Sequence, residues 1–437
     1  MEVLQLHNEK QENQKSHIHV LPTEKFKTTM ITFKFMAPLE YETITARSVL
    51  SKVLVRASQK WQDDKALNRR LSELYGAYVN SFVSKFKDKH VITISLEIVN
   101  ERYLKDQTPL FEHGLDLLNE LIWNPLIHNK QFDDKFVKQE KSLLGKKIEA
   151  MIDNKAQYSF LKLLENMFEN EAYQYLATGQ IEQVPQVTPA SLYDTYQSMI
   201  ENDYCAIYVV GNVDKQQVYN QIQSKFEIKP FTFEVSDNKA QKLDNKIEQL
   251  PKTIVATDDV DQAKLNLGYR FPTHYGKSNY YAFIVFNIMF GGDASSVLFN
   301  EVRERQSLAY SIHSQIDGKN GYLFVLSGVS TDKYEIAKQT ILEEFDKFKK
   351  GEFDDNKLAL AKKIITSQRH ESADRPKSII EISHNQILLD EPQSDEAFLN
   401  EIDKVTKEDI IKLANEAVLD TIYVLTKGGM SSETTLL

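Results

Sequence analysis

The amino-acid sequence predicts an α+β protein with two homologous domains in tandem, each a mainly antiparallel sheet covered by helices on one side. Two observations favour this fold. The chain of 437 residues exceeds the roughly 250 to 300 at which a single hydrophobic core stops growing, and one order of elements occurs twice. A polar stretch without sustained periodicity separates the two copies. We therefore expect domains at residues 1–227 and 251–437, joined by a linker at 228–250 and facing one another like a clamshell.

The first copy is predicted to contain a strand, two helices, two strands, further helices and a closing strand. Strands are predicted in "TMITFKFMAP", "AYVNSFVS", "HVITISLEIV" and "YCAIYVVGNVD". Helical periodicity is found in "TITARSVLSKVLVRAS" and in "DKALNRRLSELYG", which Gly76 ends. Thr188 as cap and Pro189 as first helical residue begin another helix. Further helices are expected at 102–122, 131–152, 155–170 and 215–225.

The second copy repeats this order. Its predicted strands are "AKLNLGYRF", "LAYSIHSQI", "GYLFVLSGV" and "DTIYVLTKG". Helices are expected in "SNYYAFIVFNIM", in "SSVLFNEVRER" and from residue 332 to about 390. A last helix, "TKEDIIKLANEAV", begins with the capping pattern Thr406 to Asp409.

Composition and charge exclude several classes of protein. Lys and Arg number 53 against 63 Asp and Glu, so the net charge of -10 argues against a general affinity for nucleic acid. The single cysteine, Cys205, is expected to be a buried structural thiol in a reducing compartment. No signal-peptide pattern and no apolar run long enough to span a membrane are present, which predicts a soluble cytoplasmic protein.

The familiar signatures of catalytic and metal sites are absent. The sequence has no H-x-x-E-H, G-x-S-x-G or P-loop motif, and no two of its ten histidines are spaced i, i+4. His17 and His19 in "HIH" are interpreted as a solvated pair. In "GGDASS" the glycines favour a sharp turn, with Ser295 or Ser296 capping the next helix, over a phosphate-binding loop, which would need a lysine and a preceding strand.

Two side chains after that turn are candidates for binding. Arg303 follows Phe299 by four residues on the predicted helix and can lie over its ring. Tyr310 alternates with Leu308 and Ile312 on one strand face, so its residue pattern alone favours a half-buried core tyrosine.

The order of elements and the words "LFNEVRERQSLAYSI" resemble the pitrilysin/insulinase family of zinc peptidases (M16), in particular its shorter, two-subunit members. The resemblance extends over almost the whole chain, through "FKFMAP", "FVKQEKSLLGKKIEAMIDN", "QIEQVPQVTPASLYDTYQSMI" and "LGYRFP". It implies the metallopeptidase fold shared by M16 and LuxS-like proteins. The sequence looks most similar to a bacterial group of paired proteins associated with aminopentanol modification of elongation factor P.

The sequence departs from the family where active members bind zinc. Their H-x-x-E-H supplies two zinc ligands and the glutamate that activates water, and a later helix adds a second glutamate. The matching positions here are Ser48, Ser51 and Lys52, followed by Lys147, although Glu149 leaves the register of the last position open. Hydroxyl and ammonium groups are poor zinc ligands, so we expect no metal and no peptidase activity from this chain alone.

The resemblance implies that Arg303 and Tyr310 hold the substrate backbone and its oxyanion. In heterodimeric members the zinc lies on one subunit and this pair on the other. The leading hypothesis is therefore a non-catalytic subunit that binds extended peptide beside an H-x-x-E-H paralogue carrying the zinc. The alternatives are a peptide-binding or scaffold protein with no role in proteolysis, and an independent enzyme using other residues. The sequence leaves the substrate, and heterodimer against homodimer, open.

Overall fold

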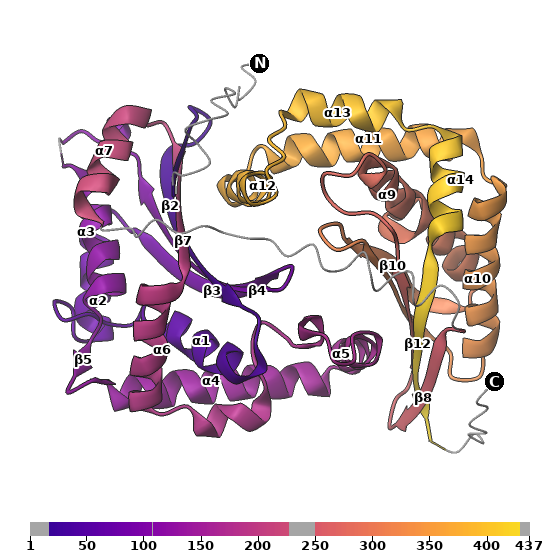
Figure 1. Ribbon diagram of the computed structural model, residues 1–437, viewed down its shortest axis with the longest axis horizontal. Helices are drawn as coiled ribbons and strands as arrows, with labels where there is room; N and C mark the ends of the chain where they lie inside the picture. The colour runs from indigo at the N-terminus through magenta and orange to yellow at the C-terminus, as the bar shows by residue number, and fades with distance from the viewer. Residues whose placement is uncertain (1–16, 107, 227–249, 429–437) are drawn as a thin grey trace.

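The computed structural model describes residues 17–106, 108–226 and 250–428, in which each half of the chain forms a five-stranded sheet (Figure 1). The strand orders are β1-β7-β2-β4-β3 and β10-β11-β9-β12-β8, which match when the second is reversed. In each sheet one outer pair is parallel and the rest are antiparallel, so the prediction of two α+β domains is confirmed. The predicted linker lies, apart from Leu250, outside the described residues.

The strands of the first half are β1 (Ile18–Pro22), β2 (Thr28–Pro38), β3 (Tyr78–Phe86), β4 (Lys89–Val99), the short ribbon β5 (Ile127–His128) with β6 (Gln131–Phe132), and β7 (Tyr204–Gly211). Those of the second half are β8 (Lys252–Asp258), β9 (Ala263–Arg270), β10 (Ala309–Asp317), β11 (Tyr322–Val329) and β12 (Val418–Lys427).

The outer strands β1 and β8 were not predicted. β1 begins within the "HIH" segment and pairs with β7, and His19 lies in the protein interior. The His19 ring stacks on Tyr208 with centroids 5.0 Å apart, and burial lowers the pKa of His19 to about 4. The interpretation of a solvated histidine pair is therefore wrong.

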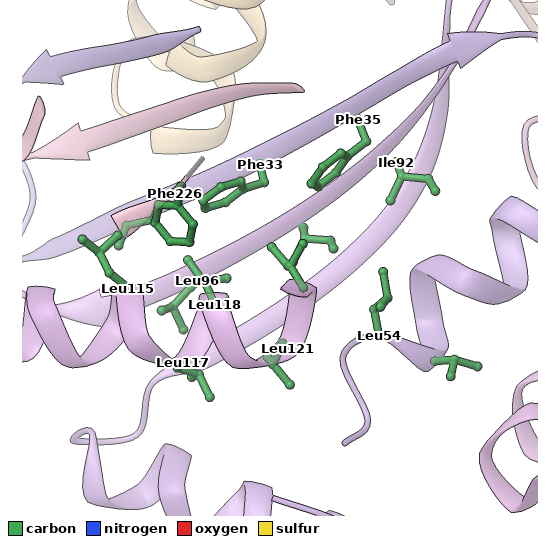
Figure 2. Close-up of a cluster of buried hydrophobic side chains, with 14 of the residues drawn as sticks. Phe33, Phe35, Leu54, Ile92, Leu96, Leu115, Leu117, Leu118, Leu121 and Phe226 are labelled. Carbon is green, nitrogen blue, oxygen red and sulfur yellow. The ribbon is translucent and has the colours of Figure 1, made fainter. Parts of the chain in front are cut away.

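The helices of the first half cover one face of its sheet. Figure 2 shows leucines of α3 packed beneath Phe33 and Phe35 of β2, with Phe226 at the end of the cluster. Thr188 accepts a hydrogen bond from the Ser191 amide in a capping box, as predicted. The helices are α1 (Tyr41–Val53), α2 (Asp64–Glu73), α3 (Leu110–Trp123), α4 (Asp134–Asp153), α5 (Lys155–Met167), α6 (Pro189–Asn202) and α7 (Lys215–Lys225), with short 3-10 turns η2 (Glu101–Tyr103), η3 (Ala172–Gln174) and η4 (Ile181–Gln186).

The second half has a corresponding core rich in phenylalanine, in which Phe286 and Phe290 contact Phe345 and Phe348. The predicted capping pattern at Thr406 and Asp409 is present. No helix in the described ranges is both long and apolar enough to cross a membrane. The helical elements are α9 (Tyr280–Asn287), η5 (Ile288–Gly292), η6 (Phe299–Arg305), α10 (Tyr334–Lys350), α11 (Asp355–Ser372), α12 (Pro376–Leu388), α13 (Asp395–Lys404) and α14 (Lys407–Glu416).

Each half of the chain contributes one helix that packs on the sheet of the other half (Figure 1). The apolar side of α5, from the first half, packs on Phe324 and Tyr423 of the second sheet. In the opposite direction, α12 packs Ile380 and Leu388 against Tyr208 and other residues of the first sheet. Each sheet is thus covered on both faces, whereas the sequence predicted helices on one side only.

Polar contacts accompany this packing. Lys34 of β2 is only 1% exposed in its side chain, and its Nζ lies 2.6 Å from Glu381 Oε1 on α12. Tyr208 of β7 shares a hydrogen bond of 2.8 Å with His384 Nδ1, also on α12. Because these pairs join residues more than 170 positions apart, they fix α12 to the first sheet.

Candidate functional site

Three of the positions that the family resemblance aligns with the zinc motif, Ser48, Ser51 and Lys52, lie on α1. The apolar stripe with Val49 and Leu50 is buried, as expected, but Ser48 and Ser51 are also only 5% and 1% exposed. The Ser51 hydroxyl donates a hydrogen bond of 2.8 Å to the Ser48 carbonyl of its own helix. Lys52 Nζ donates to the backbone carbonyl of Ser81 on β3.

The fourth position, Lys147, lies on α4 close to Lys52. Burial lowers the pKa of Lys52, and the charge of Lys147 lowers it further. Lys147 is exposed, as is Glu149, the residue that left the register open. The charges of Lys147 and Lys52 therefore act on one another across the packed helices α1 and α4.

These residues do not fit a zinc ion. The one hydroxyl with a described partner is bonded within its own helix, and two neighbouring ammonium groups repel a cation. No group of three or more His, Cys, Asp or Glu side chains in the described parts of the chain is arranged to hold a metal. The residues at these positions are therefore unsuited to holding a zinc ion for peptide hydrolysis.

A polar network that the sequence analysis missed anchors α1. Arg47 Nη2 lies 2.7 Å from Asp203 Oδ2, and its Nε donates to His90 Nδ1 at 3.1 Å. The Thr45 hydroxyl donates to Gln183 Oε1 at 2.6 Å. All five side chains are buried. The only sign of this network in the sequence was a charged residue, Arg47, next to the apolar stripe of a predicted helix.

Tyr310 is placed differently from its sequence prediction. The pairing of β10 with β11 shifts between Ala309 and Ser311, which leaves Tyr310 as the extra residue of a β-bulge. Tyr310 is 60% exposed, whereas Leu308 and Ile312 on either side are buried. The interpretation of a half-buried core tyrosine is wrong, because the bulge turns this side chain outward.

Arg303 lies on η6, the helical turn that precedes β10. Its guanidinium carbon is 4.6 Å from the centroid of the Phe299 ring, as the four-residue spacing predicted. The side chain is partly exposed, and its Nε approaches Glu304 at 3.7 Å. The Ser296 hydroxyl accepts a hydrogen bond of 3.4 Å from the Phe299 amide, which confirms one of the two serine caps proposed.

The glycine pair before η6 serves close packing. A Cβ atom on Gly291 would lie 2.8 Å from the Ser314 amide nitrogen, so only glycine allows this approach to β10. This geometry supports a tight turn over a phosphate loop. Arg303 and Tyr310 thus flank one junction of η6 with an outer strand, in the half of the chain that does not contain α1 (Figure 1).

Comparisons with known proteins agree with this picture. Residues 186–365 match the family model described as the peptidase M16 inactive domain. The probable inactive metalloprotease YmfF of Bacillus subtilis is 40% identical over 407 residues, which cover 93% of this chain and 95% of that protein. A zinc protease of the same organism, YmxG, is 24% identical over 344 residues, 78% of each chain.

Solved structures show the same fold. A conserved protein from Enterococcus faecalis superposes with a TM-score of 0.87 at 28% identity, covering 96% of this chain and 98% of that one. A peptidase M16 inactive domain from Pseudomonas fluorescens gives a TM-score of 0.77 at 16% identity, with 95% and 97% covered. Together with the identity to an inactive metalloprotease over nearly its full length, these matches show that the chain belongs to the peptidase M16 family.

Proposed function

We propose that this chain is the non-catalytic subunit of a two-chain zinc endopeptidase, and that Arg303 and Tyr310 act on a peptide bound at the partner's zinc. The observation that carries the proposal is a contrast within one chain. Ser48 and Ser51, at the zinc positions, are covered, whereas Tyr310 is turned out of the core by a bulge. A tyrosine kept only for packing has no reason to be turned outward there.

The chemistry of the pair suits stabilisation of an oxyanion. When a peptide carbonyl is attacked, negative charge develops on its oxygen, and donors aimed at that position lower the barrier. The Arg303 guanidinium can donate two hydrogen bonds in parallel, and the Tyr310 hydroxyl can donate one. The contact of Arg303 with Phe299 limits the freedom of the guanidinium before the substrate binds.

The position of Tyr310 also suits an extended peptide. Among the described strands, β10 is the outermost of the second sheet and has a strand neighbour on one side only. A peptide can pair with such an edge as an additional strand, and Tyr310 would then lie beside it. The zinc and the base that activates water would both come from an H-x-x-E-H paralogue.

Co-expression with an H-x-x-E-H member of the family tests the proposal. We expect the pair to cleave a fluorogenic peptide, and Arg303→Ala or Tyr310→Phe to lower kcat by about 100-fold or more, the loss typical of an oxyanion donor. Tyr103→Phe is the matched control, since Tyr103 is also exposed, at 48%, and lies on η2 and not on β3 or β10. We expect this variant to retain activity.

The assay also separates the rival function. If the partner cleaves equally well without this chain, or if Arg303→Ala in the complex changes nothing, the proposal is wrong. Stable association with the partner without any effect on hydrolysis would then favour a scaffold role.

A further inference from the structure

Two lysines stand at positions that the family resemblance aligns with zinc ligands, and the positive charge of Lys147 acts on Lys52. Lys52 comes from α1 and Lys147 from α4, two helices that pack against each other. The ammonium group of Lys52 is partly buried, and Lys147 is exposed. A partly desolvated cation beside a like charge is unfavourable unless an anion joins them.

Glu140, the carboxylate whose charge acts on Lys52, has an ion-pair partner of its own. The negative charge of Glu140 raises the pKa of Lys52. However, Glu140 Oε1 lies 3.3 Å from Arg56 Nε, and the same Arg56 nitrogen lies 3.5 Å from Asp64 Oδ1. Glu140 is itself buried, and burial raises the pKa of its carboxyl group. Within the described ranges, neither lysine forms an ion pair with a carboxylate.

The surroundings of Lys52 leave hydrogen-bonding capacity free. Lys52 gives one of its three donors to the carbonyl of Ser81. The hydroxyl of Ser81 is buried and has no hydrogen-bond partner among the described residues. Among the described strands, β3, which carries Ser81, is at one edge of the first sheet, and an edge strand can pair with an added peptide.

We propose that Lys52 and Lys147 bind the carboxylate of a peptide at the outer edge of β3. The Lys52 ammonium would donate hydrogen bonds both to the Ser81 carbonyl and to the bound carboxylate. The exposed Lys147 would provide a second positive charge next to that carboxylate. A cationic pair at the zinc positions thus selects acidic peptides or free peptide ends. This inference rests on the proposed function only in assuming that the natural ligand is a peptide.

Binding to the isolated full-length chain tests the inference. Four dansylated hexapeptides share an alternating threonine and valine sequence. One has a free C-terminal carboxylate and one a C-terminal amide, and the other two are amides with glutamate or glutamine at the third position. We expect at least one carboxylate form to bind at least about fivefold more tightly than its neutral counterpart. Which form does so identifies the source of the carboxylate, and the preference should weaken as salt is added.

Variants decide whether the lysines are responsible. Lys147→Gln and Lys52→Met should each abolish the preference, whereas Lys146→Gln, an exposed neighbour on α4, should retain it. If Lys52→Met does not fold, Lys147→Gln alone decides. Equal affinity for charged and neutral peptides, or a preference that survives in Lys147→Gln, overturns the inference. Hydrolysis by the complex that still depends on Arg303 would leave the proposed function standing in that case.

Discussion

Replacing Glu381 with methionine should destabilise the contact between α12 and the first sheet. Lys34 is 1% exposed in its side chain, and its one described ion pair is the contact of 2.6 Å with Glu381. Burial lowers the pKa of Lys34, and Glu381 is the main group that raises it again. Glu381→Met leaves a buried ammonium without its partner. A fully buried pair would lose about 3 to 5 kcal/mol, but Glu381 is 48% exposed, so we expect about 2 kcal/mol.

The measurement is urea unfolding followed by tryptophan fluorescence. Both tryptophans, Trp61 and Trp123, lie in the half that contains Lys34. Trp123 contacts Phe33 of β2 with ring centroids 5.6 Å apart, so its emission reports on the sheet to which α12 is fixed. Because the loss comes from a charged Lys34, it should be full at neutral pH and shrink as pH rises toward 10.5, the ordinary pKa of lysine.

The matched control is Lys34→Met, which leaves Glu381 half exposed and hydrated. It should cost less than about 1 kcal/mol, and the double variant should be nearly neutral. If Glu381→Met costs less than about 0.5 kcal/mol, or if Lys34→Met costs as much, the reasoning about an uncompensated buried charge is wrong.

Three further predictions follow from buried and exposed groups. His19 and His90 have pKa values lowered by burial to about 4 and about 3, so they bind protons more tightly when unfolded. The free energy of unfolding should therefore fall as pH drops below 6.5, by up to about 1.4 kcal/mol per pH unit for each histidine. Urea unfolding should show a smaller fall for His19→Phe than for the unaltered chain. Asp203→Asn should lower the free energy of unfolding by about 3 kcal/mol, since it leaves the Arg47 guanidinium buried without its carboxylate. A decrease below about 1 kcal/mol in the same urea assay would contradict this. Tyr310→Phe should change stability by less than about 0.5 kcal/mol, whereas Leu308→Ala in the neighbouring buried position should cost about 2 to 4 kcal/mol; equal losses would show that Tyr310 is a packing residue.

Local patterns in the sequence were sufficient for the elements that depend on local contacts. The caps at Thr188 and Thr406 involve hydrogen bonds over three residues, and the contact of Arg303 with Phe299 involves one helical turn. The packing of α5 and α12 on the sheet of the other half could not be predicted in this way. A periodic apolar stripe shows which face of a helix is buried but not which sheet covers it.

The candidate site shows the same distinction. Family resemblance identified Tyr310, but its alternation with Leu308 and Ile312 predicted the wrong orientation. A bulge adds one residue to one strand only, so it depends on the pairing of β10 with β11, and the sequence of β10 alone does not contain that information. His19 was misplaced for a similar reason, because its burial depends on the distant strand β7.

Restoring the zinc motif at the four positions that the family resemblance aligns with it should not restore a zinc site. Ser48→His, Ser51→Glu, Lys52→His and Lys147→Glu together restore the family motif in the sequence. Ser48 and Ser51 are nearly fully covered, so the larger imidazole and carboxylate would overpack the site and bury a charge. We expect the fourfold variant to bind no stoichiometric zinc and to unfold at lower urea than Lys147→Glu alone, whose single change is on the surface. One equivalent of zinc by elemental analysis, with stability unchanged, would mean that only the side chains were lost. Failure to bind zinc together with lower stability is expected if the space around Ser48 and Ser51 does not accommodate the larger ligands.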